Sequence, residues 1–190
     1  MRQKGRNLHT AISDYIYEKP VIKTERLLLR PMSSSDIPAL TQWLSDRELY
    51  TYWGKGPSRA EKDPKLLFKK QERPVRSFHL GIAMKENDHV IGDVYVFQIQ
   101  NNRMANVAIR IGRPYQSNGY GTESLLAITR FCFTHTELKR LQAEVDIRNA
   151  AFWQMMEKCG YIREGRIRQG KMVNSWCDYY IYSILSEDFL

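Results

Sequence analysis

One stretch, residues 105–135, limits what this chain can fold into more than any other. From Ala105 to Ile111, apolar side chains occupy every second position, which is the period of a β-strand. Pro114 cannot donate to a strand ladder, so pairing should stop near it. Gly119 and Gly121 follow, and the apolar residues after them recur at close to helical spacing. The pattern predicts a strand, a glycine-bearing turn and a helix.

Such a turn at the start of a helix can bind an anion, because its backbone N–H groups converge. It is not a Walker loop, since Gly121 is followed by Thr122 and no lysine. It is not a dinucleotide fingerprint either, because Ser124 stands where a third glycine is expected. Two interpretations stay open: the amides of residues 117–122 hold a pyrophosphate, or the glycines only shape a tight turn.

Strands and helices alternate along the rest of the chain. Alternating or continuous apolar residues predict strands at 21–30, 77–84, 89–98 and 141–148. A last pair of strands is predicted at 161–168 and 173–185, around Gly170-Lys171. Capping residues and helical spacing predict helices after Ser33-Ser-Ser-Asp36, once or twice within 49–70, and from Asn149 to Lys158 with Gly160 as the stop. This order predicts an α/β domain with a mixed sheet.

The length of 190 residues suits one domain with a real core. We expect a polar, basic N-terminal arm over residues 1–20 and a single domain over residues 21–190. Without a membrane-length apolar run or a signal-peptide core, the simplest location is cytoplasmic. The three cysteines lie among apolar neighbours and should be reduced core thiols, and no Cys/His spacing predicts a zinc site.

The net charge is +8, from 29 basic and 21 acidic residues. Lysine and arginine are spread along the chain and do not gather in one tail. This distribution favours a local anionic ligand, or a charge that serves only solubility, over a dedicated nucleic-acid binder. No membrane partner is expected, because no apolar run is long enough to span a membrane.

Four motifs, in the expected order, resemble those of the GCN5-related N-acetyltransferase (GNAT) superfamily. Gln116-x-x-Gly119-x-Gly121 resembles its acyl-CoA signature, and Asn149 with the ending Lys158-Cys-Gly160-Tyr161 resembles its second motif. Thr24-Glu-Arg-Leu-Leu-Leu-Arg-Pro31 and Trp176-Cys-Asp178-Tyr-Tyr180 resemble the branch that includes ribosomal-protein N-terminal acetyltransferases. The resemblance implies the GNAT fold, an α/β (α+β) domain. Its mixed, mostly antiparallel sheet of six to seven strands is flanked by helices and has a splayed central parallel pair.

The resemblance also implies acetyl-CoA as the co-substrate. The pantetheine arm would enter between the splayed strands, pair with the backbone of Ile109, Arg110 and Ile111, and contact Asn149. The pyrophosphate would lie in the loop formed by Gln116, Ser117, Asn118, Gly119, Tyr120, Gly121 and Thr122. Arg113 or Arg148 could neutralise the nucleotide phosphates, or could be ordinary surface charges.

The resemblance implies amine acetylation, which needs a base, and Glu144 is the first candidate. It lies on the strand before Asn149, where ribosomal-protein alanine acetyltransferases carry their catalytic glutamate. Partial burial would raise its pKa toward the working range. The alternative is a structural pair between Glu144 and Arg110 or another basic neighbour. Asp146, on the same face, is the substitute base.

The proton donor departs from the family pattern. Many relatives have a tyrosine at the position of Met156, and nearer ones have a serine at the position of Phe152. Neither side chain can donate a proton. Water, the substrate amine or a tyrosine such as Tyr161 would then protonate the thiolate, and the backbone amide of Ile111 would polarise the carbonyl.

The leading hypothesis is an N-acetyltransferase that acts on a primary amine, first a protein or peptide N-terminal α-amine. Within the enzyme class the alternative acceptor is a small amine, a polyamine or an aminoglycoside, although a charge of +8 counts against polycations. A non-catalytic acyl-CoA-binding module on the same fold is the other alternative. The resemblance further implies a homodimer through the C-terminal strands.

Overall fold

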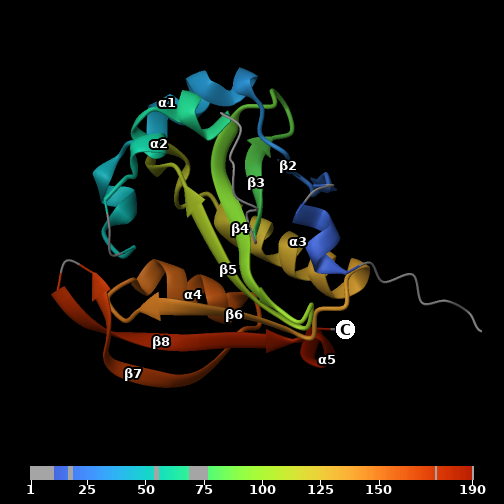
Figure 1. Ribbon diagram of the computed structural model, residues 1–190, viewed down its shortest axis with the longest axis vertical. Helices are drawn as coiled ribbons and strands as arrows, with labels where there is room; N and C mark the ends of the chain where they lie inside the picture. Colours follow the sequence, from blue (N-terminus) through green and yellow to red (C-terminus); the bar gives the residue numbers. More distant parts are fainter. Residues whose placement is uncertain (1–10, 17–18, 54–55, 69–76, 174, 190) are drawn as a thin grey trace, which may run out of the picture.

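The computed structural model describes residues 11–16, 19–53, 56–68, 77–173 and 175–189. In this part of the chain eight strands form one sheet, in the order β1-β2-β3-β4-β5-β6-β8-β7 (Figure 1). The strands are β1 (Ile22–Lys23), β2 (Leu27–Arg30), β3 (Ser77–Met84), β4 (Val90–Gln100), β5 (Met104–Ile111), β6 (Arg140–Asp146), β7 (Ile162–Val173) and β8 (Ser175–Leu185).

Helices cover both faces and one end of the sheet (Figure 1). The α-helices are α1 (Ile37–Trp43), α2 (Arg59–Lys62), α3 (Tyr120–His135), α4 (Ala150–Lys158) and α5 (Ser186–Phe189). The 3₁₀ helices are η1 (Ile12–Ile16), η2 (Ser34–Asp36), η3 (Arg47–Tyr50), η4 (Pro64–Phe68) and η5 (Arg113–Tyr115).

The predicted strand, turn and helix of residues 105–135 are confirmed as β5, η5 and α3. Gly119 is the N-cap of α3 and has a φ of 80°, a left-handed conformation that favours glycine. Asn149 caps α4 as predicted, since its Oδ1 accepts the N–H of Phe152 at 3.2 Å. Gly160 ends that helix with a φ of 84°.

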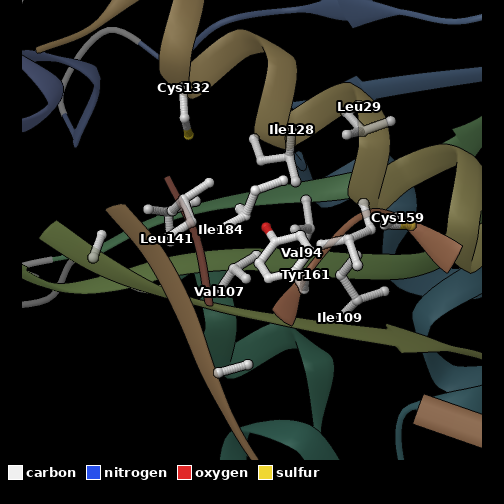
Figure 2. Packing of buried hydrophobic residues seen from close by; sticks show 14 of the residues in the cluster. Leu29, Val94, Val107, Ile109, Ile128, Cys132, Leu141, Cys159, Tyr161 and Ile184 are labelled. Atoms are coloured by element: carbon white, nitrogen blue, oxygen red, sulfur yellow. The ribbon is translucent and has the colours of Figure 1, made fainter. Parts of the chain in front are cut away.

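The main hydrophobic core lies between α3 and one face of the sheet. Alternate residues of the central strands, such as Val94, Val107 and Ile109, meet Ile128 of α3 there (Figure 2). Ile12 is fully buried in the same core, so the described part of the expected N-terminal arm docks onto the domain. The three cysteines are free and buried, as predicted.

The parallel pair of β5 and β6 is short and then separates. The two strands pair only at Met104–Arg140, Ala105–Leu141 and Asn106–Gln142 in the described residues, yet β5 continues to Ile111 and β6 to Asp146. Figure 1 shows the two strands diverging from their common end. The expected splayed parallel pair is therefore confirmed, and it leaves two facing strand edges without a strand between them.

Two expectations about the elements were wrong, and a third is confirmed with shorter helices. The sheet has eight strands instead of six to seven, because residues 21–30 form two short strands and not one. The segment 49–70, where one or two helices were predicted, contains the short helices α2 and η4 in its described residues. The last hairpin does not turn at Gly170-Lys171, because β7 runs on to Val173 through an irregularity in its pairing with β8.

Candidate active site

A cleft of about 290 Å³ opens where β5 and β6 separate. Strand residues from both sides of the separation form its floor, α4 contributes its first turn, and the segment after η3 contributes two aromatic side chains. The lining residues are Tyr52, Trp53, Phe97, Gln98, Asn106, Val107, Ala108, Ala143, Glu144, Val145, Asp146, Asn149 and Phe152. The two carboxylates expected to act as bases and the capping asparagine thus meet in one cavity.

Glu144 lines the cleft but is exposed, so the expected partial burial was wrong. Its position on β6 is opposite Ile181 of β8, and its charge reaches the neighbouring Tyr179. Burial and then this charge raise the pKa of Tyr179 above its ordinary value. Arg110, the partner considered in the structural alternative, instead donates hydrogen bonds to Asp93 and Glu61.

Asp146 has a fully buried carboxylate that holds the turn after β6. It accepts hydrogen bonds from the backbone N–H of Arg148 at 2.9 Å and from the Arg148 guanidinium. These hydrogen bonds hold the pKa of Asp146 below its ordinary value, which makes it a weaker base. Asp146 is therefore better suited to positioning the start of α4 than to proton transfer.

The glycine turn has architectural reasons for both of its glycines. Ser117 and Gly119 both adopt positive φ angles, 63° and 80°. A Cβ added at Gly121 would lie 2.9 Å from the Sδ of Met155, so this glycine lets α3 approach α4. The turn still presents backbone N–H groups at the start of a sixteen-residue helix, where an anion is favoured.

The edge of β5 that faces the separation carries Ile109 and Ile111, not Arg110. The carbonyl oxygen of Arg110 lies against Gly92 of β4, and backbone groups alternate between the two edges of a strand. The side-chain amide of Gln116 donates to the carbonyl oxygen of Ile111 at 2.9 Å. Gln116 therefore ties the glycine turn to this edge, and the N–H of Ile111 stays directed toward the separation.

Arg26 is the basic residue at the glycine turn, and sequence reasoning missed it. Its guanidinium donates to the carbonyl oxygen of Asn118 at 3.0 Å, pairs with Glu123, and lies 4.6 Å from the ring centre of Tyr120. The signal was present in the Thr24-Glu-Arg motif, although nothing local linked that motif to residues far along the chain.

The two arginines that we expected near the nucleotide phosphates are engaged elsewhere. Arg148 pairs with Asp146, and Arg113 pairs with Glu48 at 2.7 Å and with Asp46 at 3.6 Å. Both arginine side chains remain about half exposed. Arg26 is also paired, but it contacts the carbonyl oxygen of Asn118 in the glycine turn, whereas the ion pairs of Arg113 and Arg148 are with residues outside that turn. This difference favours the interpretation of Arg113 and Arg148 as ordinary surface charges.

Tyr161 was the wrong candidate for the proton donor. It is buried in the main core, where its hydroxyl pairs with Thr129 at 2.7 Å and lies among residues such as Ile128 (Figure 2). Relatives carry a proton donor at the position of Met156 or of Phe152, both on α4. Met156 is fully buried in the main core, whereas Phe152 lines the cleft. Tyr52 does line the cleft, and its phenol hydroxyl can donate a proton.

The sequence model of the acetyltransferase (GNAT) domain family matches residues 26–162, which include the glycine turn, β6 and α4. The chain belongs to the GNAT acetyltransferase family. GNAT enzymes take their acetyl group from acetyl-CoA, so acetyl-CoA is the co-substrate, and the chain is an N-acetyltransferase.

Relatives and solved structures agree with the GNAT assignment. The uncharacterised N-acetyltransferase YnaD of Bacillus subtilis (strain 168) is 27% identical over 169 residues, covering 88% of this chain and 98% of YnaD. A spermidine N-acetyltransferase from Vibrio cholerae in complex with CoA and spermine superposes with a TM-score of 0.76 at 20% identity, covering 87% of this chain and 99% of that one.

A second GNAT structure, the ribosomal-protein-S5-alanine acetyltransferase from Vibrio fischeri, has a TM-score of 0.76 at 20% identity, covering 90% of this chain and 100% of that one. At such identities the two superpositions show the fold alone. Separately, none of the helices in the described residues is long and apolar enough to cross a membrane.

Proposed function

We propose that this enzyme acetylates the N-terminal α-amine of a protein or peptide. The observation that carries the proposal is the cleft at the separation of β5 and β6, which brings Glu144, Asn149 and two aromatic residues of the acceptor side together. The donor and the acceptor would meet there from opposite sides of the sheet.

The residues of the donor side fit the shape and charge of acetyl-CoA. The free edge of β5 offers the backbone groups of Ile109 and the N–H of Ile111 to the donor, whose pantetheine arm contains amides. Asn149, at the start of α4, lines the same space. The glycine turn offers converging N–H groups to the pyrophosphate, and Arg26 adds a positive charge beside it.

The reaction joins the amine nitrogen to the acetyl carbon and breaks the bond from that carbon to sulfur. Glu144 accepts a proton from the acceptor ammonium, directly or through a water, so that the nitrogen lone pair is available. The N–H of Ile111 donates to the thioester oxygen as charge develops on it. Tyr52 gives a proton to the leaving sulfur and regains one from the nitrogen as the amide forms.

The small number of acidic residues that line the cleft favours an acceptor with few positive charges. Glu144 and Asp146 are the acidic residues among those that line it in the described part of the chain. A polyamine brings several charges that each need compensation when they leave water. An α-amine brings one, and the aromatic rings of Tyr52, Trp53 and Phe97 can pack on the first side chains of a peptide.

A polyamine is the second candidate, because the fold is shared with a spermidine N-acetyltransferase whose structure holds spermine. The deciding experiment measures CoA release from acetyl-CoA with two acceptors, a hexapeptide with N-terminal alanine and spermidine. We expect transfer to the peptide and mass addition at its α-amine. Preference for spermidine would overturn the peptide assignment, and transfer to neither, with acetyl-CoA still bound, would favour a binding module.

We also propose a homodimer through the C-terminal strands. β7 is the last strand of the sheet, and Ile162, Ile167 and Trp176 on this hairpin are exposed. An edge strand with apolar neighbours can pair with a second copy. Light scattering should give twice the chain mass, and Ile162→Lys should reduce it to the single chain. A monomeric mass for the unaltered protein would contradict this proposal.

A further inference from the structure

A buried guanidinium lies beside the cleft and takes no part in the proposed reaction. Arg110 is 4% exposed, on the sheet face opposite the main core. Its Nε and Nη2 donate to the carboxylate of Asp93, directly across on β4, and Nη2 also donates to the hydroxyl of Tyr95 at 2.7 Å. Its Nη1 donates to Glu61 and to the hydroxyl of Tyr50. All five N–H groups of this guanidinium thus have an acceptor.

The acceptors come from two separate parts of the chain. Asp93 and Tyr95 belong to the central sheet, whereas Tyr50 ends η3 and Glu61 belongs to α2. A helix of four residues is not stable on its own, so α2 depends on contacts such as this ion pair. Arg110 therefore joins the segment that carries η3 and α2 to the sheet.

Glu61 uses both of its carboxylate oxygens in this connection. Oε1 accepts from Arg110, while Oε2 accepts the N–H of Ser58 at 2.8 Å. The hydroxyl of Ser58 in turn accepts the N–H of Glu61, which completes a capping box at the start of α2. One side chain thus both begins the helix and anchors it.

The cluster reaches the cleft through Trp53. The guanidinium carbon of Arg110 lies 5.2 Å from the centre of the Trp53 ring, within the range of a cation–π contact. Trp53 lines the cleft and is 40% exposed, and this contact connects its indole to the Arg110 cluster. The neighbouring Tyr52 lines the cleft as well.

We propose that Arg110 is a positioning residue for acceptor recognition, which anchors α2 to the sheet and holds Trp53 in place as part of the acceptor-side wall of the cleft. The inference rests on the proposed acceptor cleft. It assigns Arg110 a role away from the donor, because the donor-binding edge of β5 faces the separation from β6, whereas the backbone of Arg110 faces β4. Loss of the connection should weaken acceptor binding and leave acetyl-CoA binding unchanged.

The test is Glu61→Gln, with Glu48→Gln as its matched control. Glutamine keeps the size of Glu61 but offers one acceptor oxygen where two are used. Glu48 belongs to the same segment and also pairs with an arginine, Arg113, but its side chain is 69% exposed. In Glu61→Gln, amide hydrogen exchange should accelerate in residues 50–53 and 59–62 and stay unchanged in α3. In Glu48→Gln, exchange should match the unaltered protein.

The kinetic arm uses the N-terminal alanine hexapeptide. Glu61→Gln and Trp53→Leu should each raise the peptide KM about three- to tenfold, the size of a partly exposed cation–π contact, with kcat and acetyl-CoA affinity kept. The double variant should show less than the product of the two effects, because both act through one wall.

Unchanged exchange in Glu61→Gln would overturn the proposal, and so would faster exchange with an unchanged peptide KM. Absence of peptide transfer by the unaltered protein would count against the proposed acceptor instead. In that case, amide hydrogen exchange of Glu61→Gln alone would decide whether Arg110 holds α2 and Trp53 in place.

Discussion

Asn106 of β5 and Gln142 of β6 form the last pair in register before these parallel strands separate. Beyond this pair, the backbone of β5 up to Ile111 and of β6 up to Asp146 face an opening instead of each other. Backbone N–H and C=O groups need partners, and a substrate that carries amides can supply them. The active cleft is thus a consequence of strand topology, and the side chains refine it.

Glu144→Gln should lower kcat by about a hundredfold or more, the typical contribution of a general base, with little change in acetyl-CoA affinity. The amide keeps the shape of Glu144 but cannot accept a proton from the amine. Steady-state CoA release measures kcat, and calorimetry measures donor binding. Glu137→Gln, an exposed carboxylate away from the cleft, is the control. Full activity of Glu144→Gln would assign the base elsewhere.

Tyr52→Phe should lower kcat at least about tenfold, because it removes the hydroxyl that protonates the leaving thiolate and keeps the ring that lines the cleft. The effect should shrink with a thioester whose thiol is more acidic, since that leaving group needs less help. Rates with acetyl-CoA and an activated acetyl thioester provide the comparison. An equal loss with both donors would indicate that Tyr52 only packs there.

Gly119→Glu should abolish acetyl-CoA binding, because it places a negative charge in the turn that we assign to the pyrophosphate. Gly119→Ala separates charge from strain, since alanine at a φ of 80° costs about 1 kcal/mol of stability. We expect Gly119→Ala to bind acetyl-CoA detectably. Gly165→Glu is the control, because a Cβ added at Gly165 meets nothing within 4 Å. Unchanged donor affinity in Gly119→Glu would exclude this turn as the pyrophosphate site.

Arg26→Gln should raise the KM for acetyl-CoA about threefold or more, and the difference should narrow as salt is added, because exposed charges are screened. Arg113→Gln is the matched control, since Arg113 is similarly exposed and also pairs with a glutamate, Glu48. Its KM should stay close to that of the unaltered protein. Equal effects of the two substitutions would show that overall charge, and not the position of Arg26, attracts the donor.

Asp93→Asn should reduce the free energy of unfolding by about 3 kcal/mol, because it breaks a buried ion pair and leaves Arg110 less well compensated. Asp88→Asn removes the exposed partner of Arg30 and should cost less than about 1 kcal/mol. Urea denaturation of the two variants gives the comparison.

The ion pair of Asp93 and Arg110 also predicts how the free energy of unfolding depends on pH in acid. Burial alone would raise the pKa of Asp93, but the charge and hydrogen bonds of Arg110 hold this pKa below its ordinary value. A lowered pKa stabilises the folded state above the unfolded value of about 4, and this stabilisation is lost as pH falls below that value. Stability of the unaltered protein should therefore fall more steeply below pH 4 than that of Asp93→Asn. Parallel curves would contradict the assignment.

Local patterns predicted elements well where several signals agreed. Residues 77–84 were predicted as a strand from alternation and the following turn, and β3 has these bounds. The predicted turn at Gly170-Lys171 failed because pairing with β8 continues past it, with Gln169 at a φ of 44° within the irregularity. Long-range pairing overrode a local glycine preference there.

The order of strands and helices, the glycine turn and the family motifs were all readable from neighbouring residues, because strand period, helix spacing and capping are local properties. The residues that surround Arg110 and Tyr161 could not be predicted from their neighbours in the sequence. Alternation shows that a residue faces one side of a strand, but not what covers that side. Asp93 stands opposite Arg110, and Thr129 meets Tyr161, only because segments distant in the chain are brought into register. Tertiary pairing therefore decided which tyrosine reaches the cleft, which arginine reaches the glycine turn, and which carboxylates are already occupied.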